Sequence, residues 1–409
     1  MDKSLNCYSI FDLRELAKKR VPRGPFEFVD RGTEEEVSLN NNREVFDRIR
    51  FKTRTFVDVS KRTQETEIFG VKHKMPLVIA PTGTAGLMWY EGEIALAKAA
   101  RTAGIPFTLA TGSMTAMERV ADEAGGELWF QLYLWPDRSM SHELVDRAKA
   151  AGYKALVVTV DGVSAGNREY NIRNGFTLPF TYSPVALWDM IQHPRWLFGV
   201  LFKYLATTGM PMYQNYPERA KAKMTAGPMG RSSLRTDSVS WDDLDALRKI
   251  WPHKLIVKGI LNAEDAASAV DHGADGIDVS NHGGRNLDGI ISPIEALPEI
   301  VDAVGKRATV FCDSGFRRGS DVVKALCLGA NAVMVGRSTL YGVAAGGEVG
   351  AARALEIFRS EIHRNIALLG VDRLEKLGPQ YLKFIDQSLR PASVRAPLRA
   401  VPDAKVAGA

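Results

Sequence analysis

The chain has 409 residues, of which 45% are hydrophobic and 25% are charged, a balance typical of a soluble globular protein with a large core. Its formal net charge of +5 is small for this length and does not point to nucleic acid, whose binding needs basic residues clustered on one face. The three cysteines are too few and too scattered for a disulfide framework or a zinc site, and no stretch reaches the ~18 apolar residues that span a bilayer.

The N-terminus lacks the apolar run of a signal peptide, so a cytoplasmic protein is expected. Residues 1–70 contain a predicted helix at 9–19 and a charged, irregular stretch. Apolar strand-like runs and helical patterns then alternate strictly. The expected strands are 77–81, 105–110, 127–134, 155–160, 254–260, 276–280, 308–313 and 332–336. The expected helices are 92–103, 115–124, 138–150, 241–250, 263–272, 293–304, 318–328 and 348–368.

Eight such units with nearly all-apolar strands predict an α/β fold, namely a (β/α)₈ TIM barrel with an N-terminal helical segment. A doubly wound open sheet is the alternative, but residues 81–86 match the glycine-rich turn that it needs only loosely. A long insertion, about 162–240, follows the fourth strand and exceeds the length of a plain connection. We expect one barrel domain over 1–385 and a flexible C-terminal tail over 386–409, which is rich in Pro, Ala and Arg.

Polar residues and glycines occupy the ends of nearly all these strands, where a TIM barrel carries its active site. Scattered surface charge would not respect these positions. In chain order the strand-end residues are Pro81, Thr82 and Gly83; Gln131 and Tyr133; Thr159 and Asp161, with Arg168 just beyond; Lys258; His282 and Arg285; Asp313, Gly315 and Arg317; and Gly336 and Arg337.

The pair of His282 and Arg285 carries most of the chemical signal. A histidine can act as a base, and a guanidinium group three residues later can bind a carboxylate with two hydrogen bonds. Together they suit the deprotonation of a small organic acid. Asp161 could pair with His282 and fix its tautomer, or it could cap the following loop. An ordinary loop with a surface histidine is the alternative for the whole segment.

The ends of the seventh and eighth strands are the usual phosphate site of a barrel. Gly315 and Gly336 can offer bare backbone N–H groups there, and Arg317 and Arg337 can add positive charge, although arginines at such positions also cap helices or pair with acids.

Three further strand residues each have two interpretations. Lys258 could stabilise negative charge on a cofactor ring or could extend its head group to solvent. Gln131 and Tyr133 are two residues apart and could both face the barrel mouth, or the tyrosine could belong to the core.

Together these residues resemble the FMN-dependent L-2-hydroxy acid dehydrogenase/oxidase family, which includes enzymes acting on glycolate, lactate and mandelate. The resemblance covers about residues 5–380 and is strongest at 129–133, 251–255, 280–285 and 313–324. It implies FMN as the cofactor, a small L-2-hydroxy acid as the substrate, and a quinone or dioxygen as the electron acceptor. Family members are often tetramers, which implies a homo-oligomer.

The resemblance also implies a role for each residue. His282 is implied to be the base with Asp161 as its partner, Arg168 and Arg285 to hold the substrate carboxylate beside Tyr133, and Lys258 to lie near the flavin N1–C2 carbonyl. The remaining residues are implied to contact FMN: Pro81, Thr82 and Gly83 face N5, Gln131 and Thr159 contact the isoalloxazine ring, and Asp313, Gly315, Arg317, Gly336 and Arg337 hold the ribityl chain and the phosphate.

The sequence departs from the family pattern at the substrate and beside the flavin. Phe28 stands where the family has a tyrosine that binds the substrate carboxylate, so a hydrogen bond worth ~1–3 kcal/mol is missing and a larger or more apolar acid is expected. Ala110 replaces a flavin-contacting serine, and that contact is lost or passes to Thr111. Gly83 stands where many members have alanine and leaves more space at N5.

Residues 184–212 are unusually apolar and aromatic for a connection. The matching segment binds the membrane in membrane-associated members of the family, which implies peripheral contact with the inner face of a membrane. Packing on the barrel and an oligomer contact are the alternatives. Two other functions stay open: an FMN-binding barrel enzyme of another reaction class, and a non-catalytic binding module. The two guanidinium groups around one base argue against the first.

Overall fold

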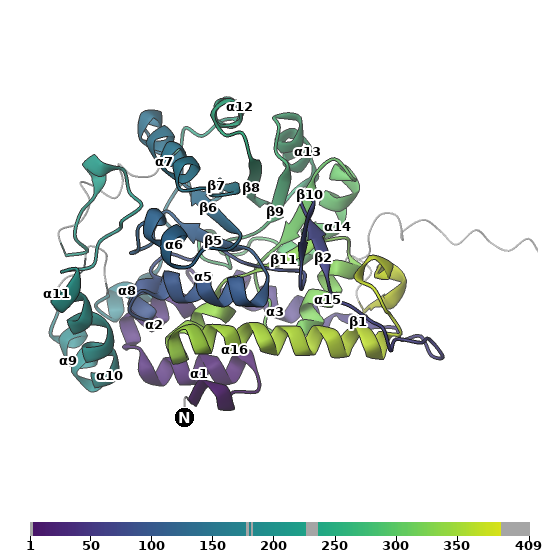
Figure 1. Cartoon of the computed structure of the whole chain (residues 1–409), viewed down its shortest axis with the longest axis horizontal. Coiled ribbons are helices and arrows are strands. Elements are labelled where there is room, and N and C mark those ends of the chain that lie inside the picture. Colours follow the sequence, from purple (N-terminus) through teal and green to yellow (C-terminus); the bar gives the residue numbers. More distant parts are fainter. Residues whose placement is uncertain (1–2, 177–179, 181–182, 226–235, 386–409) are drawn as a thin grey trace, which may run out of the picture.

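Eight parallel strands close into a barrel at the centre of the molecule (Figure 1). The computed structural model describes residues 3–176, 180, 183–225 and 236–385, so the predicted tail at 386–409 lies outside the described residues. The barrel strands are β4 (Leu77–Ile79), β5 (Phe107–Ala110), β6 (Leu128–Leu132), β7 (Ala155–Thr159), β8 (Lys254–Ile260), β9 (Gly276–Val279), β10 (Thr309–Cys312) and β11 (Ala332–Val335). Each lies inside a predicted range, and β11 pairs with β4 to close the barrel, so the TIM-barrel prediction is confirmed and the open sheet is excluded.

Helices surround the barrel as predicted. They are α5 (Gly92–Ala103), α6 (Met117–Glu123), α7 (Arg138–Ala150), α12 (Trp241–Ile250), α13 (Ala263–Asp271), α14 (Pro293–Val304), α15 (Gly319–Cys327) and α16 (Arg337–Leu369). The helix α16 is longer than the predicted 348–368, because a first helical part begins at Arg337. That part ends in a kink at Gly346 and Gly347, where the backbone leaves the helical conformation. These two glycines interrupt the sequence pattern, which is why the sequence indicated only the second part.

The N-terminal segment is more ordered than the sequence predicted. The helix α1 (Ile10–Arg20) begins where expected, with Ser9 and Asp12 forming a capping box. The stretch predicted to be irregular contains α2 (Arg23–Asp30), α3 (Val37–Asp47), β1 (Ile49–Phe51), and the hairpin of β2 (Thr66–Ile68) and β3 (Val71–His73). The strand β1 pairs with β12 (Leu382–Phe384) and so joins the two ends of the barrel domain.

The β2–β3 hairpin closes the N-terminal end of the barrel. Its turn residue Phe69 has a left-handed backbone (φ +54°) and packs against Trp129 and Phe311, with ring centroids 5.9 and 5.7 Å away. Ile68 joins these rings in the apolar cluster inside the barrel. This end is filled, so ligands are expected at the opposite end, where the strands have their carboxyl ends.

The insertion after β7 forms its own layer of short helices on one side of the molecule (teal in Figure 1). Its elements are α8 (Glu169–Arg173), α9 (Pro184–Gln192), α10 (Pro194–Trp196), the π-helical turn η2 (Leu197–Phe202), α11 (Lys203–Thr207) and η3 (Glu218–Ala220). Trp196 anchors this layer by donating its indole N–H to the carbonyl of Leu87, at 2.6 Å. Leu87 lies in the short helix α4 (Ala85–Met88) that follows β4.

The remaining short elements lie near the chain ends and are η1 (Lys3–Asn6), η5 (Leu374–Lys376) and η6 (Pro379–Tyr381). Among the described residues, no helix combines the length and the apolar character needed to cross a bilayer.

The barrel core provides a direct test of this arrangement. Trp129 is 1% exposed inside the barrel, whereas Trp188 on α9 is 63% exposed. We expect Trp129→Ala to lower the free energy of unfolding by about 3–5 kcal/mol, because it removes a large buried side chain and leaves a cavity. Thermal unfolding followed by circular dichroism would then show a midpoint several degrees lower, with Trp188→Ala as the matched control that stays near the wild-type midpoint. Equal midpoints for the two variants would contradict the assigned core.

Candidate active site

A cavity of about 920 Å³ lies at the carboxyl ends of the barrel strands. Its size is at the upper end of the ~300–1,000 Å³ typical of ligand sites. Most of the predicted site residues line it: Phe28, Pro81, Thr82, Gly83, Tyr133, Arg168, Lys258, His282, Arg285, Asp313, Gly315, Arg317, Gly336 and Arg337. The remaining three, Gln131, Thr159 and Asp161, are not part of the wall. Asp161 bonds to His282, Gln131 bonds to the wall residue Thr111, and Thr159 pairs in register with Lys258.

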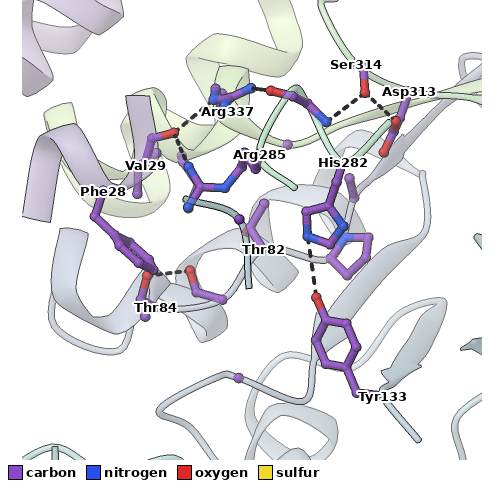
Figure 2. A pocket seen from close by; sticks show the side chains of 18 of the residues that line it. Phe28, Val29, Thr82, Thr84, Tyr133, His282, Arg285, Asp313, Ser314 and Arg337 are labelled. Carbon is purple, nitrogen blue, oxygen red and sulfur yellow. Dashed lines mark hydrogen bonds between the residues drawn. The ribbon is translucent and has the colours of Figure 1, made fainter. Parts of the chain in front are cut away.

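His282 is held between the carboxylate of Asp161 and the phenol of Tyr133, and Figure 2 shows its contact with Tyr133. Its Nδ1 lies 2.8 Å from Asp161 Oδ1, and its Nε2 lies 3.4 Å from Tyr133 Oη. Because a carboxylate can only accept a hydrogen bond, Nδ1 of His282 carries a proton and donates a hydrogen bond to Asp161. In the neutral ring Nε2 is then the basic atom, and it lies on the side of the cavity-lining Tyr133. The surface-histidine interpretation is therefore wrong.

The backbone and the charges around His282 are also unusual. The residue has a left-handed backbone (φ +56°), a strained conformation that functional sites often retain. Burial alone would raise the pKa of Asp161, but the charge of His282 and their hydrogen bond, helped by Lys258, hold that pKa below its usual value. Asp161 therefore remains a carboxylate at neutral pH and fixes the orientation of the imidazole.

Two guanidinium groups lie side by side near this histidine. Arg168 donates from Nη2 to the backbone carbonyl of Arg285 at 3.2 Å, and both guanidinium carbons lie over the ring of Phe28, at 5.7 and 5.1 Å. Burial and the nearby Arg168 lower the pKa of Arg285 to about 10. Two cations that destabilise each other in this way favour an anion between them, and Phe28 adds an apolar surface beside that anion.

Lys258 is buried and has several partners. Its Nζ lies 2.9 Å from Asp278 Oδ2 and 2.7 Å from Ser280 Oγ, and it also contacts Asp313 Oδ2. Burial alone would lower the pKa of Lys258, but the two carboxylates raise it above its usual value, so the ammonium stays charged. The alternative of a lysine extending to solvent is excluded. The sequence analysis missed Asp278, although a charged residue inside the apolar strand β9 was a visible signal.

The predicted phosphate site contains two arginines with different partners. Arg337 donates to the backbone carbonyl of Val29 (Figure 2) and to those of Arg31 and Gly283, at 2.8 to 3.1 Å. Arg337 therefore caps the C-terminal end of α2, as the sequence allowed for an arginine at this position. Among the described residues, the guanidinium group of Arg317 donates to the adjacent carbonyl of Phe316 alone. Burial lowers the pKa of both arginines, and neighbouring cations add to this effect, as expected for a site that binds an anion.

Buried polar atoms that lack a hydrogen-bond partner among the described residues test whether the site fits the flavin that the resemblance implies. The side-chain nitrogen of Gln131 and the hydroxyl of Thr159 are buried and have no hydrogen-bond partner among the described residues. Buried polar groups are normally paired, so these two indicate a missing ligand next to β6 and β7. The residues present fit an isoalloxazine ring.

Thr111 can replace the missing serine only in part. Its hydroxyl donates to the carbonyl of Gln131 at 2.6 Å, so it offers a flavin an acceptor but no proton. Further wall residues come from the insertion and were not predicted one by one; they are Ile172, Phe176, Tyr213, Tyr216 and Asp237. The length and aromatic content of the insertion were the only signals for them.

Comparisons with known proteins agree with this geometry. A family model described as FMN-dependent dehydrogenase matches residues 17–384. The (S)-mandelate dehydrogenase of Pseudomonas putida is 43% identical over 382 residues, which are 93% of this chain and 95% of that protein. An L-lactate oxidase of Nostoc sp. is 39% identical over 383 residues, covering 91% of this chain and 97% of that protein. The crystal structure of monotopic membrane protein (S)-mandelate dehydrogenase superimposes with a TM-score of 0.87 and 42% identity, covering 93% of this chain and all of that one (100%).

Proposed function

Because this chain belongs to the FMN-dependent dehydrogenase family, we propose that it oxidises an L-2-hydroxy acid to the corresponding 2-oxo acid, with FMN as its cofactor. The observation that carries the proposal is the position of His282. This residue bonds to Asp161 and Tyr133, and it lines the same cavity as Arg168 and Arg285. A base beside paired cations suits a substrate that carries both a removable proton and a carboxylate.

The residues would hold FMN along the cavity. Arg317, Arg337 and the backbone N–H groups of Gly315 and Gly336 would bind the phosphate, and Asp313 the ribityl hydroxyls. Gln131 and Thr159 would satisfy the polar edge of the ring, whose other edge would face Pro81, Thr82 and Gly83. Lys258 would stabilise negative charge on the ring. When bound, FMN accepts two electrons from the substrate.

The chain's own groups would perform the proton chemistry. Arg168 and Arg285 would hold the carboxylate and orient the substrate, and Tyr133 would donate a hydrogen bond beside it. Nε2 of His282 would remove a proton from the hydroxyl or from the α-carbon. The imidazolium that forms would be stabilised by Asp161, at 2.8 Å from its Nδ1.

The substrate side of the cavity favours an apolar acid. Phe28 supplies no hydroxyl to the carboxylate and instead packs against Phe176, with ring centroids 5.6 Å apart. Ile172 and Val163 extend this apolar wall. An aryl or otherwise bulky L-2-hydroxy acid would bury more surface here than lactate or glycolate, which supports the expectation drawn from Phe28.

We further propose that electrons pass to a quinone or to dioxygen, and that the protein is a homo-oligomer at the inner face of a membrane. The membrane proposal rests on one face of the insertion, where Trp188, Phe198 and Phe202 are exposed beside Arg195 and Lys203. The opposite face packs on the barrel through Trp196 and Tyr204. An exposed apolar face with basic residues suits a lipid interface.

The proposed reaction is tested by anaerobic mixing of the purified protein with lactate, glycolate, mandelate, and long-chain and aryl L-hydroxy acids while flavin bleaching is followed. We expect at least one acid, most rapidly an aryl acid, to bleach the flavin. His282→Ala should keep bound FMN and slow bleaching by about 10²–10⁴-fold, because the base is lost. His272→Ala is the matched control, since His272 bonds to Asp245 outside the cavity wall. Wild-type bleaching rates in His282→Ala would contradict the assigned base, and readmitted air would show whether dioxygen is an acceptor.

The phosphate site is tested by two adjacent arginines. Arg317 lines the cavity, whereas Arg318 forms an ion pair with Glu361 at 2.8 Å and is not in the wall. We expect Arg317→Met to weaken FMN binding by about 10–100-fold, since it removes charge-assisted hydrogen bonds to the phosphate. Arg318→Met should bind FMN like the wild type. The measurement is titration of apoprotein with FMN, followed by flavin fluorescence, and equal affinities of the two variants would overturn the assignment.

The membrane face is tested by sedimentation with vesicles of anionic phospholipid. Replacing Trp188, Phe198 and Phe202 together with serine should lower the vesicle-bound fraction at least about tenfold, because three large apolar side chains no longer leave water. Leu368→Ser is the control, since Leu368 is equally exposed but lies on α16. Unchanged sedimentation would exclude the lipid contact. A smaller molar mass of the triple variant in light scattering would show instead that this face joins subunits.

A further inference from the structure

One buried carboxylate near the cavity is not used by the proposed mechanism. Asp278 lies in the middle of β9, whose residues are all buried, and it is 0% exposed. Its Oδ2 lies 2.9 Å from Lys258 Nζ, and its Oδ1 has no hydrogen-bond partner among the described residues. Lys258 and Asp313 line the cavity but Asp278 does not, so Asp278 lies behind the ammonium group.

The charges around this carboxylate do not balance. One ammonium group, that of Lys258, contacts both Asp278 and Asp313. Asp161, just beyond the end of β7 on the other side of β8, adds a further negative charge but is paired with His282. Among the described residues, the thiol of Cys312 on β10 also interacts with Asp278, and this thiol is neutral because burial raises its pKa. With both aspartates ionised, the cluster of Lys258, Asp278 and Asp313 carries one excess negative charge.

This excess matters because Lys258 is the group proposed to stabilise negative charge on the flavin. A second carboxylate at 2.9 Å offsets part of the field of the ammonium group. Added negative charge on the ring would then be opposed unless a proton enters the cluster. Asp278 is suited to accept it: burial and the negative charge of Asp313 raise the pKa of Asp278 to about 8, although Lys258 opposes the shift. Its Oδ1 has no competing donor among the described residues.

Resting on the proposed function, we propose that Asp278 is a positioning residue that sets the reduction potential of bound FMN through Lys258 and takes up one proton when FMN is reduced. The hydroxy acid loses two electrons and two protons as it becomes the 2-oxo acid. Both electrons and one proton would convert FMN to its reduced anion, and His282 would take the other proton. A further proton, from solvent, converts the Asp278 carboxylate to a neutral carboxyl. The extra negative charge of the reduced ring is thereby cancelled, and Lys258 keeps its full interaction with the ring.

The potential of the holoenzyme tests this proposal, measured by anaerobic redox titration between about pH 6 and pH 9. Each proton taken up per two electrons changes the equilibrium tenfold per pH unit, or about 30 mV. We expect about 60 mV per pH unit for the wild type above about pH 8, where Asp278 is ionised before FMN is reduced, and about 30 mV for Asp278→Asn, which keeps the shape but cannot take up the proton. The reduction potentials of the wild type and of Asp278→Asn should converge at acidic pH. At alkaline pH the variant should be at least about 30 mV more positive, a tenfold change in the equilibrium.

The control is Asp275→Asn, which removes a carboxylate that pairs with Arg248 and Lys254 and does not line the cavity. Its potential should match the wild type at every pH. Equal slopes for the wild type and Asp278→Asn would overturn the proposal, and a purely structural ion pair would change stability without changing the slope. If Asp278→Asn fails to fold or to hold FMN, a wild-type slope that stays near 30 mV per pH unit above about pH 8 overturns the proposal. A steeper slope there that Asp278→Glu keeps and Asp278→Leu loses supports it. A wild-type protein that binds no FMN would instead contradict the proposed function.

Discussion

Two partly buried guanidinium groups, those of Arg285 and Arg337, hold the end of α2 against the barrel mouth. Both donate to the carbonyls of Val29 and Arg31, where the last carbonyl groups of a helix lack partners. The same contact fixes Phe28 at the substrate side of the cavity and, through the carbonyl of Gly283, fixes the loop that carries His282. Three regions far apart in the sequence therefore meet at these two arginines.

This arrangement has an electrostatic consequence for ligands. Arg168, Arg285, Arg317 and Arg337 gather around one cavity, and burial lowers the pKa of the last three. Neutral backbone carbonyls satisfy the hydrogen bonds of these groups but not their charge. A phosphate at one end of the cavity and a carboxylate at the other would supply that charge, so ligand binding and the docking of the N-terminal segment stabilise each other.

The sequence was sufficient for the parts of the molecule that follow repeated local rules. Apolar runs such as 254–260 and 276–280 located the strands, and the rule that barrel sites lie at the carboxyl ends of strands located His282, Arg285 and Lys258. It failed where tertiary contacts decide. The helices α2 and α3 and the β2–β3 hairpin are stabilised by the barrel ends, and their own patterns are too short to indicate them. The partners of Lys258 and Arg337 depend on which strands become neighbours, and no local pattern contains that information.

The insertion shows how one segment can serve two surfaces. Its inner residues, among them Trp196 and Tyr204, are buried against the barrel, and Phe176 and Tyr213 reach the cavity wall. Its outer residues Phe198 and Phe202 stack on each other, with centroids 5.3 Å apart, yet both are exposed. Contact with an external apolar phase would remove more of this exposed apolar surface from water. Within the described part of the chain, the helices α9, α10 and α11 and the turn η2 contribute no residue to the cavity wall, whereas α8 and Tyr213, which flank them in the sequence, do. Contact of the outer face with lipid would therefore act on the cavity only through these flanking segments.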